Sequence, residues 1–222
     1  MNVHYGTCCL CNKQITKAGA TRHLKQCMAA HETPGRRTAE FLHLRVDDFS
    51  AGLYWLDLAI KSGASLVSLD EFLRAIWLEC CGHLSVFEIG SVHYLCDDYD
   101  DPNPYTGETW MDVPISRALA PAVTKFVYRY DFGTTTTLRL RVVRRYKAAT
   151  EKEAVRLLAR NEPPVWPCDV CGQPATKICP VCAYTDSPYF YCNKHTSKHR
   201  CEYGGFLPVV NSPRMGMCAY SG

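Results

Sequence analysis

Residues 41–60 have the sequence FLHLRVDDFSAGLYWLDLAI, in which two apolar stretches flank a short polar segment. Apolar and polar side chains alternate in Phe41–Val46, as they do in a strand with one buried face. Leu53–Ile60 has the composition of a second strand, and Gly52 precedes it in a turn segment. We therefore predict that the two strands pair across the turn containing Gly52.

A helix is predicted after this hairpin. The segment Ser68-Leu-Asp-Glu71 has the spacing of a capping box, in which serine and glutamate side chains bond the free N–H groups that begin a helix. Gly82 is expected to end that helix. Cys80 and Cys81 lie on its C-terminal part and are interpreted as packing residues, because a free cysteine behaves as a small hydrophobe. The apolar stripe comprises Leu69, Phe72, Leu73, Ile76, Trp77 and Cys80.

Beyond this helix the sequence predicts further short elements and a second helix. Thr150-x-x-Glu153 is another capping box, so a helix is predicted from there to about Arg160, before Pro163 and Pro164 prevent its continuation. The predicted strands are Ser85–Ile89, His93–Cys96 and a hairpin of Lys125–Asp131 and Thr135–Arg145 around Gly133, with a turn or short helix from Pro114 to Leu119.

The N-terminal segment has the spacing of a zinc site. Cys8-x2-Cys11 precedes His23-x3-Cys27, and zinc takes four tetrahedral nitrogen or sulfur ligands. Thr21 is the predicted N-cap of a helix that places His23 and Cys27 on one face. Two interpretations follow: a nucleic-acid finger whose helix presents Arg22, Lys25 and Gln26, or a zinc-stapled cap docked on the central domain.

The C-terminal segment holds eight further metal-ligand candidates, enough for two zinc ions. An interleaved cross-brace would use Cys168, Cys171, Cys192 and His195 for one ion and Cys179, Cys182, His199 and Cys201 for the other. A sequential arrangement would group the first four cysteines instead. Interleaving is favoured because it ties a loop-rich segment with few apolar residues into one unit. The segment Tyr191-Cys-Asn-Lys-His195-x3-His199 resembles cross-brace and treble-clef fingers of the MYND, HIT and B-box kind, which mostly bind proteins.

These ligand sets predict three structural zinc ions. A catalytic zinc keeps an open position for water, whereas these sets are complete and dominated by thiolate. The C-x2-C spacing with histidines in register also favours metal over disulfides. The cysteines outside the predicted sites are Cys9, Cys80, Cys81, Cys96 and Cys218.

Composition is that of an ordinary globular protein: 222 residues, 47% hydrophobic and 21% charged, with a formal net charge of +3. No apolar run is long enough to cross a membrane, and the first residues lack the layout of a signal peptide. We therefore expect a soluble cytoplasmic protein with no membrane partner.

The predicted fold class is α+β, a mainly antiparallel sheet with a packed helix, flanked by small zinc-binding modules. The predicted divisions are a C2HC-type zinc finger (1–31), a linker (32–40), the α+β domain (41–162), a two-zinc cross-brace-like finger (163–205) and a tail (206–222).

Residues 41–145 resemble the plasmid pRiA4b ORF-3-like domain family, also labelled as passenger "TnpR" proteins of insertion elements. The resemblance rests on Phe41–Val46, Leu69–Trp77, Gly82-His-Leu-x-x-Phe-x-Ile89 and Tyr130-Asp-Phe-Gly133. In many members the last motif continues as Asp-x-Trp-x-His, whereas here threonines follow, as in the branch with terminal zinc fingers. The resemblance implies a compact α+β domain whose biochemical activity is not established. The nucleophilic serine and supporting arginines of a serine resolvase are not found.

His83, Tyr130 and Asp131 are weak candidates for a catalytic or ligand-binding pocket, with Arg45 or Arg129 nearby. The structural alternative is that His83 caps a helix end and that Asp131 binds backbone donors at the Gly133 turn. Four acidic residues, Asp97, Asp98, Asp100 and Asp101, lack the spacing of a calcium loop and are interpreted as a solvated loop.

Strand alternation in Leu138–Arg145 predicts a basic stripe. Arg139 and Arg141 should face outward, joined by Arg129 on the neighbouring strand. Phosphate contacts from such a stripe would support DNA or RNA binding, although charged outer faces also serve solubility.

Two classes of function follow. The first is a non-enzymatic, zinc-stabilised binding or adaptor protein that contacts nucleic acid or protein. The alternative is an enzyme with a pocket around His83, Tyr130 and Asp131 that acts on nucleic acid or a small molecule.

Overall fold

The computed structural model describes residues 4–31, 37–96, 108–150, 152–185, 187–201 and 205–222. The chain forms two compact units. The larger consists of Met1–Arg74 and Leu84–Glu162, and the smaller consists of Ala75–His83 and Pro163–Gly222. The predicted acidic loop of Asp97, Asp98, Asp100 and Asp101 lies outside the described residues.

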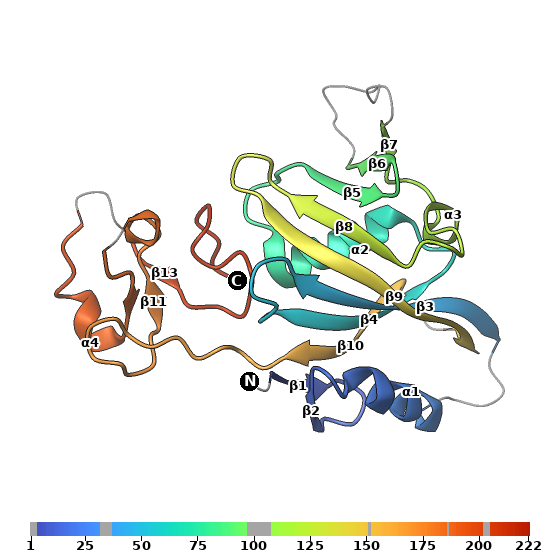
Figure 1. The fold of residues 1–222 in the computed structure, drawn as a ribbon, viewed down its shortest axis with the longest axis horizontal. Coiled ribbons are helices and arrows are strands. Elements are labelled where there is room, and N and C mark those ends of the chain that lie inside the picture. The colour runs from blue at the N-terminus through green and yellow to red at the C-terminus, as the bar shows by residue number, and fades with distance from the viewer. Residues whose placement is uncertain (1–3, 32–36, 97–107, 151, 186, 202–204) are drawn as a thin grey trace. The chain divides into compact units, whose positions relative to one another are not determined.

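The larger unit is built on one ten-stranded sheet (Figure 1). Neighbouring strands are antiparallel throughout the described residues, except for the parallel pair β6 and β7. This agrees with the predicted α+β class with a mainly antiparallel sheet. The strands in sheet order are β2 (Gln14–Thr16), β1 (Tyr5–Cys8), β10 (Val155–Asn161), β4 (Trp55–Lys61), β3 (Thr38–Asp48), β9 (Thr136–Ala149), β8 (Lys125–Tyr130), β5 (Ser85–Ile89), β6 (Val92–Leu95) and β7 (Glu108–Trp110).

The predicted central hairpin is confirmed as β3 and β4, which pair from Phe41 opposite Lys61 to Asp47 opposite Trp55. The buried carboxylate of Asp48 organises the turn between them. Its Oδ2 accepts hydrogen bonds from the backbone N–H groups of Ala51 and Gly52, both at 3.0 Å, and its Oδ1 accepts one from Tyr54 N at 2.8 Å. Gly52 has a φ of +64°, a left-handed conformation that glycine adopts without steric cost.

Three other predictions for the central residues are also confirmed. The hairpin around Gly133 is β8 and β9, the two short strands after Gly82 are β5 and β6, and the short helix is α3 (Ile115–Ala118). The inward positions of the hairpin, Phe126, Tyr128, Leu138 and Leu140, are all buried.

The helix predicted from the capping box at Thr150 is wrong, because this segment forms strand β10. β10 pairs with β1 along one edge and with β4 along the other, so its backbone bonds are made between strands. Leu158 and Ala159 are fully buried, and the carboxamide Oδ1 of Asn161 accepts a hydrogen bond from Trp55 N. Pairing on both edges therefore outweighs the local helix signal, which acts only through neighbouring residues.

The predicted helix over the sheet is present as α2 (Leu66–Leu73), but its N-cap is Ser65 and not Ser68. The Ser65 hydroxyl accepts the hydrogen bond from Ser68 N at 3.3 Å. Leu66, Leu69 and Leu73 are buried, as the apolar stripe predicts. A π-helical turn, η1 (Arg74–Leu78), follows and ends before Cys80, so Cys80 and Cys81 lie beyond the helical residues.

The N-terminal helix α1 (Ala20–Ala30) also begins earlier than expected. Its N-cap is Gly19, which makes no side-chain capping bond, so the predicted N-cap Thr21 lies inside the helix.

The smaller unit contains a three-stranded sheet in the order β12 (Phe190–Tyr191), β11 (Lys177–Ile178), β13 (Leu207–Pro208), with the short helices η2 (Cys182–Tyr184) and α4 (Asn193–Thr196). Strand β13 belongs to the segment 206–222 that was expected to be a tail. Ser212, Arg214 and Tyr220 of this segment are buried, so it is folded into the unit.

Replacing Asp48 with alanine should lower the free energy of unfolding by about 2–3 kcal/mol, because the backbone N–H groups of Ala51, Gly52 and Tyr54 lose a charged acceptor. Urea denaturation monitored by circular dichroism measures this change. The exposed Asp112 provides the control, since Asp112→Ala should change stability by less than about 0.5 kcal/mol. Equal stability of the two variants would contradict the capping role of Asp48.

Candidate metal centres and a basic groove

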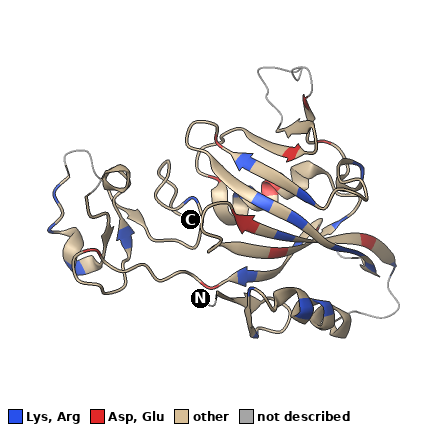
Figure 2. Ribbon diagram, in the orientation of Figure 1, with Lys and Arg blue, Asp and Glu red and all other residues tan. Residues whose placement is uncertain are grey.

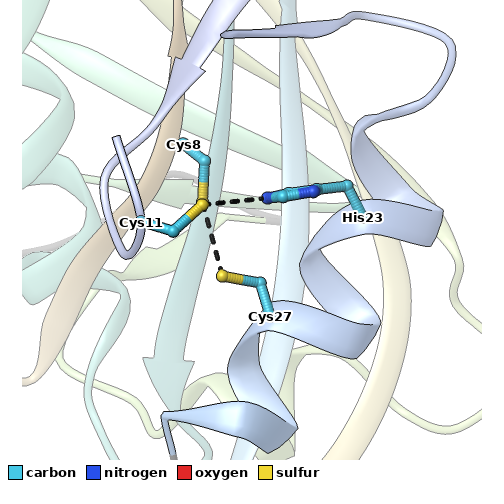
Figure 3. A group of neighbouring side chains, drawn as sticks. All are labelled: Cys8, Cys11, His23 and Cys27. Carbon is cyan, nitrogen blue, oxygen red and sulfur yellow. Dashed lines mark hydrogen bonds between the residues drawn. The ribbon is translucent and has the colours of Figure 1, made fainter. Parts of the chain in front are cut away.

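The predicted N-terminal ligands come together in one cluster (Figure 3). Cys8 ends β1, Cys11 follows in a tight turn, and α1 supplies His23 and Cys27 from successive turns. Asn12 closes the tight turn with a φ of +57° and donates from its backbone N–H to the Cys8 carbonyl at 2.8 Å. All four ligand atoms lie within 4.8 Å of one another.

The spacing of these atoms suits a tetrahedral ion. With Zn–S bonds of about 2.3 Å and a Zn–N bond of about 2.0–2.1 Å, sulfurs lie about 3.8 Å apart, and sulfur and nitrogen about 3.6 Å apart. In the cluster, the Sγ atoms of Cys8 and Cys27 are 3.8 Å apart, and Cys11 Sγ lies 3.4 Å from His23 Nε2. Burial, together with the neighbouring Cys11 and Cys8 thiols, raises the pKa of Cys27 to about 12. Once ionised, these neighbouring thiolates would repel one another, and a bound dication would offset that repulsion.

The N-terminal module is continuous with the large sheet. β1 pairs with β10, where Cys8 lies opposite Ala159. Gly6 is required in β1 because a Cβ there would lie 2.4 Å from both the Arg160 carbonyl and the Trp55 ring. Leu24, Cys27 and Met28 of α1 are buried in one apolar cluster that also contains Phe41, Trp55 and Leu158. The module therefore has the geometry of a docked cap, with Arg22, Lys25 and Gln26 on the exposed side of the helix.

The C-terminal ligands form two interleaved clusters, the pairing that the sequence favoured. One comprises Cys168, Cys171, Cys192 and His195, and the other comprises Cys179, Cys182, His199 and Cys201. In the first, the sulfurs of Cys171 and Cys192 are 3.8 Å apart, and His195 Nδ1 lies 3.4 Å from Cys192 Sγ. In the second, His199 Nε2 lies 3.6 Å from Cys182 Sγ. Both sets again fit the edges of a tetrahedron.

The thiols of these clusters differ in acidity. Burial opposes ionisation of Cys168, but hydrogen bonds from backbone N–H groups, those of Cys192, Val170 and Cys171, outweigh it and lower its pKa to about 6. Burial and the neighbouring Cys179 and Cys201 thiols raise the pKa of Cys182 to about 12. At neutral pH Cys182 therefore retains a proton that a metal ion must displace.

A fourth Cys/His cluster lies where the sequence predicted none. It comprises Cys80, Cys81, His83 and Cys218, whose ligand atoms also lie within 4.8 Å of one another. The interpretation of Cys80 and Cys81 as packing residues is wrong: Cys81 is exposed and Cys80 only partly buried. In the sequence this cluster is indicated only by the adjacent residues Cys80 and Cys81 with His83 close behind them. These residues lack the C-x2-C spacing by which the other sites were found. Within the part of the chain that the structure describes, four clusters could thus hold metal ions, against the three expected.

The candidate pocket residues have other roles. Asp131 is buried at a φ of +65°, and its Oδ1 accepts hydrogen bonds from the backbone N–H groups of Gly133 and Thr134 at 2.9 and 3.2 Å. This is the structural alternative, in which Asp131 binds backbone donors at the Gly133 turn. Tyr130 is fully buried, with the Arg74 guanidinium 4.8 Å from its ring centre. His83 belongs to the fourth cluster, where its Nε2 lies 3.0 Å from Cys81 Sγ.

The predicted basic stripe is exposed on one face of the large sheet. Arg139 donates to the Phe49 carbonyl at 3.2 Å and lies over the Phe49 ring, and Arg129 pairs with Glu88 at 2.7 Å. Arg141 lies directly opposite Lys125 on β8. Among the described residues neither Arg141 nor Lys125 has a recorded ion pair, so both charges face solvent.

This stripe forms one side of a groove of about 1130 Å³. The other side is formed by Lys17 and Ala18, which lie between β2 and α1, and by Thr21 in the first turn of α1. Lys17 and Lys125 were not singled out from the sequence, because only the fold brings them beside the arginines. Figure 2 shows Lys and Arg positions along β8, β9 and α1. The charged residues lining the groove are Lys17, Arg45, Asp47, Glu88, Lys125, Arg139 and Arg141, and His4 also lines it.

A buried charge cluster holds Arg45 in the groove wall. The Asp57 carboxylate is fully buried and accepts from Arg45 Nε and NH2 at 3.1 and 2.8 Å, and its Oδ1 lies 2.7 Å from His43 Nε2. The guanidinium also lies 4.8 Å from the centre of the Trp55 ring. Lys17 is fixed by Asp47 at 2.7 Å, so the groove has several positioned cations.

No known protein family and no curated protein matches this chain. A solved structure that resembles part of this chain is that of a protein of unknown function from Methanosarcina mazei Go1, which is 13% identical. The match covers 55% of this chain and 67% of that one, with a TM-score of 0.44.

None of the described helices is both long and apolar enough to cross a bilayer.

Metal binding should release protons and weaken as pH falls, because thiols with raised pKa values, such as those of Cys27 and Cys182, must be deprotonated to ligate. Calorimetric titration of the reduced, metal-free protein with zinc in two buffers of different ionisation enthalpy measures the protons released. A heat that does not depend on the buffer would contradict this prediction.

Proposed function

We propose that this protein is a zinc-stabilised, non-enzymatic binding protein whose basic groove contacts the phosphate backbone of DNA or RNA. The observation that carries the proposal is the groove itself. It places Lys17, Arg45, Lys125, Arg139 and Arg141 around one depression, against only Asp47 and Glu88. A concentration of cations of this kind suits the regularly spaced charges of a nucleic-acid backbone.

Zinc is the metal that the donor sets favour. Three thiolates and one imidazole, at tetrahedral separations, are the ligands of structural zinc sites, and no position is left for a reacting water. The N-terminal ion would hold the turn at Cys11 against α1. It would thereby fix the segment around Lys17 that forms one side of the groove. The role of this ion would be to position side chains that contact the nucleic acid.

Lys125 and Arg141, which form no ion pair or side-chain hydrogen bond with the described residues, would make the strongest phosphate contacts. Lys17, Arg45 and Arg129 each have a carboxylate partner, which reduces the charge they offer to a ligand. Lys125 and Arg141 lie side by side on adjacent strands without one. Arg22 and Lys25, exposed on α1, would add further contacts to a ligand that continues past the groove.

The C-terminal zinc module supports a second contact, with protein. Several large apolar side chains are exposed on this unit, and they include Val165 at 77%, Tyr184 at 71% and Val170 at 56%. Exposed apolar side chains suit contact with a protein better than contact with a nucleic-acid backbone. The protein would then act as an adaptor between a nucleic acid and a protein partner.

The resemblance of residues 41–145 to the pRiA4b ORF-3-like family is part of this proposal. The antiparallel sheet with α2 packed on it is compatible with the compact α+β domain that the resemblance implies. The enzyme alternative has less support, because Asp131 is engaged by its own turn and Tyr130 is fully buried.

The combined substitution Lys125→Ala and Arg141→Ala should weaken nucleic-acid binding on the order of tenfold at low salt. It should also reduce the slope of log affinity against log salt by about 2, since two phosphate contacts are lost. Fluorescence anisotropy with single-stranded and duplex DNA and RNA, over a series of salt concentrations, measures both effects.

The matched control replaces two exposed lysines outside the groove, Lys152→Ala and Lys194→Ala, which removes the same net charge. Its affinity and salt slope should stay close to those of the wild-type protein. Equal losses in both double variants would show that only net charge matters, and the groove would then have no specific role.

A further inference from the structure

We propose that Cys80, Cys81, His83 and Cys218 form a fourth zinc site, which staples the C-terminal segment to the residues that follow the α2–η1 helix. All four residues belong to the smaller unit, although Cys218 is 137 residues from Cys81. The proposal is independent of nucleic-acid binding, because it concerns residues that do not line the groove.

The geometry of the sulfurs supports a single ion. The Sγ atoms of Cys80 and Cys81 are 3.8 Å apart, and those of Cys81 and Cys218 are 3.6 Å apart, close to the edge of about 3.8 Å expected around zinc. These separations are far longer than the S–S bond of about 2.0 Å in a disulfide. His83 Nε2 lies 3.0 Å from Cys81 Sγ and 3.1 Å from Cys218 Sγ. The imidazole would move outward by about half an ångström on zinc binding, to reach the tetrahedral separation.

The backbone is shaped to direct these side chains toward one point. Gly82 has a φ of +75°, which turns the chain between Cys81 and His83. Cys218 and Ala219 have φ values of 45° and 56°, a left-handed conformation that is uncommon for residues with a side chain. Two such residues in succession are held in place only when surrounding interactions determine them, and a ligand bond from Cys218 would be one.

The two chain segments are already in contact beside the cluster. The Ser212 hydroxyl donates to the Trp77 carbonyl at 2.6 Å, and both groups are buried. Arg214, also fully buried, places its NH2 group 3.5 Å from Cys80 Sγ. A guanidinium at this distance favours the thiolate form and offsets the net charge of about −1 that three thiolates leave on a zinc site. A bound metal ion would therefore add a further link between two segments that these contacts already join.

Exposure distinguishes this site from the other three. Cys81 and Cys218 are both exposed, whereas each of the other clusters has at least two buried ligands. Water and chelators reach an exposed ion more readily, so the fourth ion should be the first to leave. A labile zinc on an otherwise stable protein is the expected property.

Zinc counting on the full chain tests this proposal. Native mass spectrometry of reduced protein purified with ample zinc should show four ions in the wild type and three in Cys218→Ser. The exposed Cys9 lies outside every cluster, so Cys9→Ser is the matched control and should retain four. Cys81→Ser is a second variant and should also retain three. This second variant shows whether the loss of zinc in Cys218→Ser results only from a disturbed C-terminal segment.

Release kinetics give a second measurement. When a chromogenic chelator is added to the wild-type protein, one zinc equivalent should leave at least tenfold faster than the rest, and Cys218→Ser should lack this phase. Three ions in the wild type, four ions in Cys218→Ser, or a Cys81–Cys218 disulfide in place of the fourth ion would overturn the proposal. Retention of the other three ions in both variants would separate this site from the proposed N- and C-terminal zinc sites.

Discussion

The larger unit depends on the pairing of β10 with strands on both of its edges. β4 on one side belongs to the central hairpin, and β1 on the other carries the first metal ligand of the N-terminal module. Without β10 the module would lose the strand pairing that joins β1 to the sheet, and α1 would lose Leu158 and Ala159 from the apolar surface that it covers. The groove would then lose the wall that contains Lys17.

Each Cys/His cluster brings together side chains from short segments of the chain. Burial and the neighbouring thiols raise the pKa values of Cys27 and Cys182, and neighbouring thiols also raise the pKa of Cys81. For Cys81 the hydrogen bond with Cys218 is the largest cause. A bound dication would offset the repulsion between the thiolates. The short strands and loops of the smaller unit bury few apolar side chains, so a bound metal would supply stability that a core would otherwise provide.

Charge is arranged differently on the two faces of the large sheet. On the face covered by α2, the polar groups are satisfied internally: Asp70 accepts from Ser85 Oγ and from Tyr128 OH, both at 2.6 Å. Burial and the adjacent Asp70 charge raise the pKa of Tyr128 well above its usual value, so its hydroxyl remains a donor. On the opposite face Arg139 and Arg141 of β9 stay exposed, and the part of that face formed by Phe41, Trp55 and Ala59 packs against α1.

The sequence by itself determined whatever depends on residues close together in the chain. Alternation identified the β3–β4 and β8–β9 hairpins, and ligand spacing brought together the N-terminal set of Cys8 to Cys27 and the C-terminal sets. Local signals misled where distant partners decided the outcome. The capping box at Thr150 indicated a helix, yet two neighbouring strands took up the backbone of β10, and Ser65 replaced Ser68 as the N-cap of α2. Only the tertiary structure placed Lys17 and Lys125 beside the arginines and brought Cys218 to Cys81. Such contacts join residues more than a hundred positions apart, and no periodic pattern in the sequence indicates them.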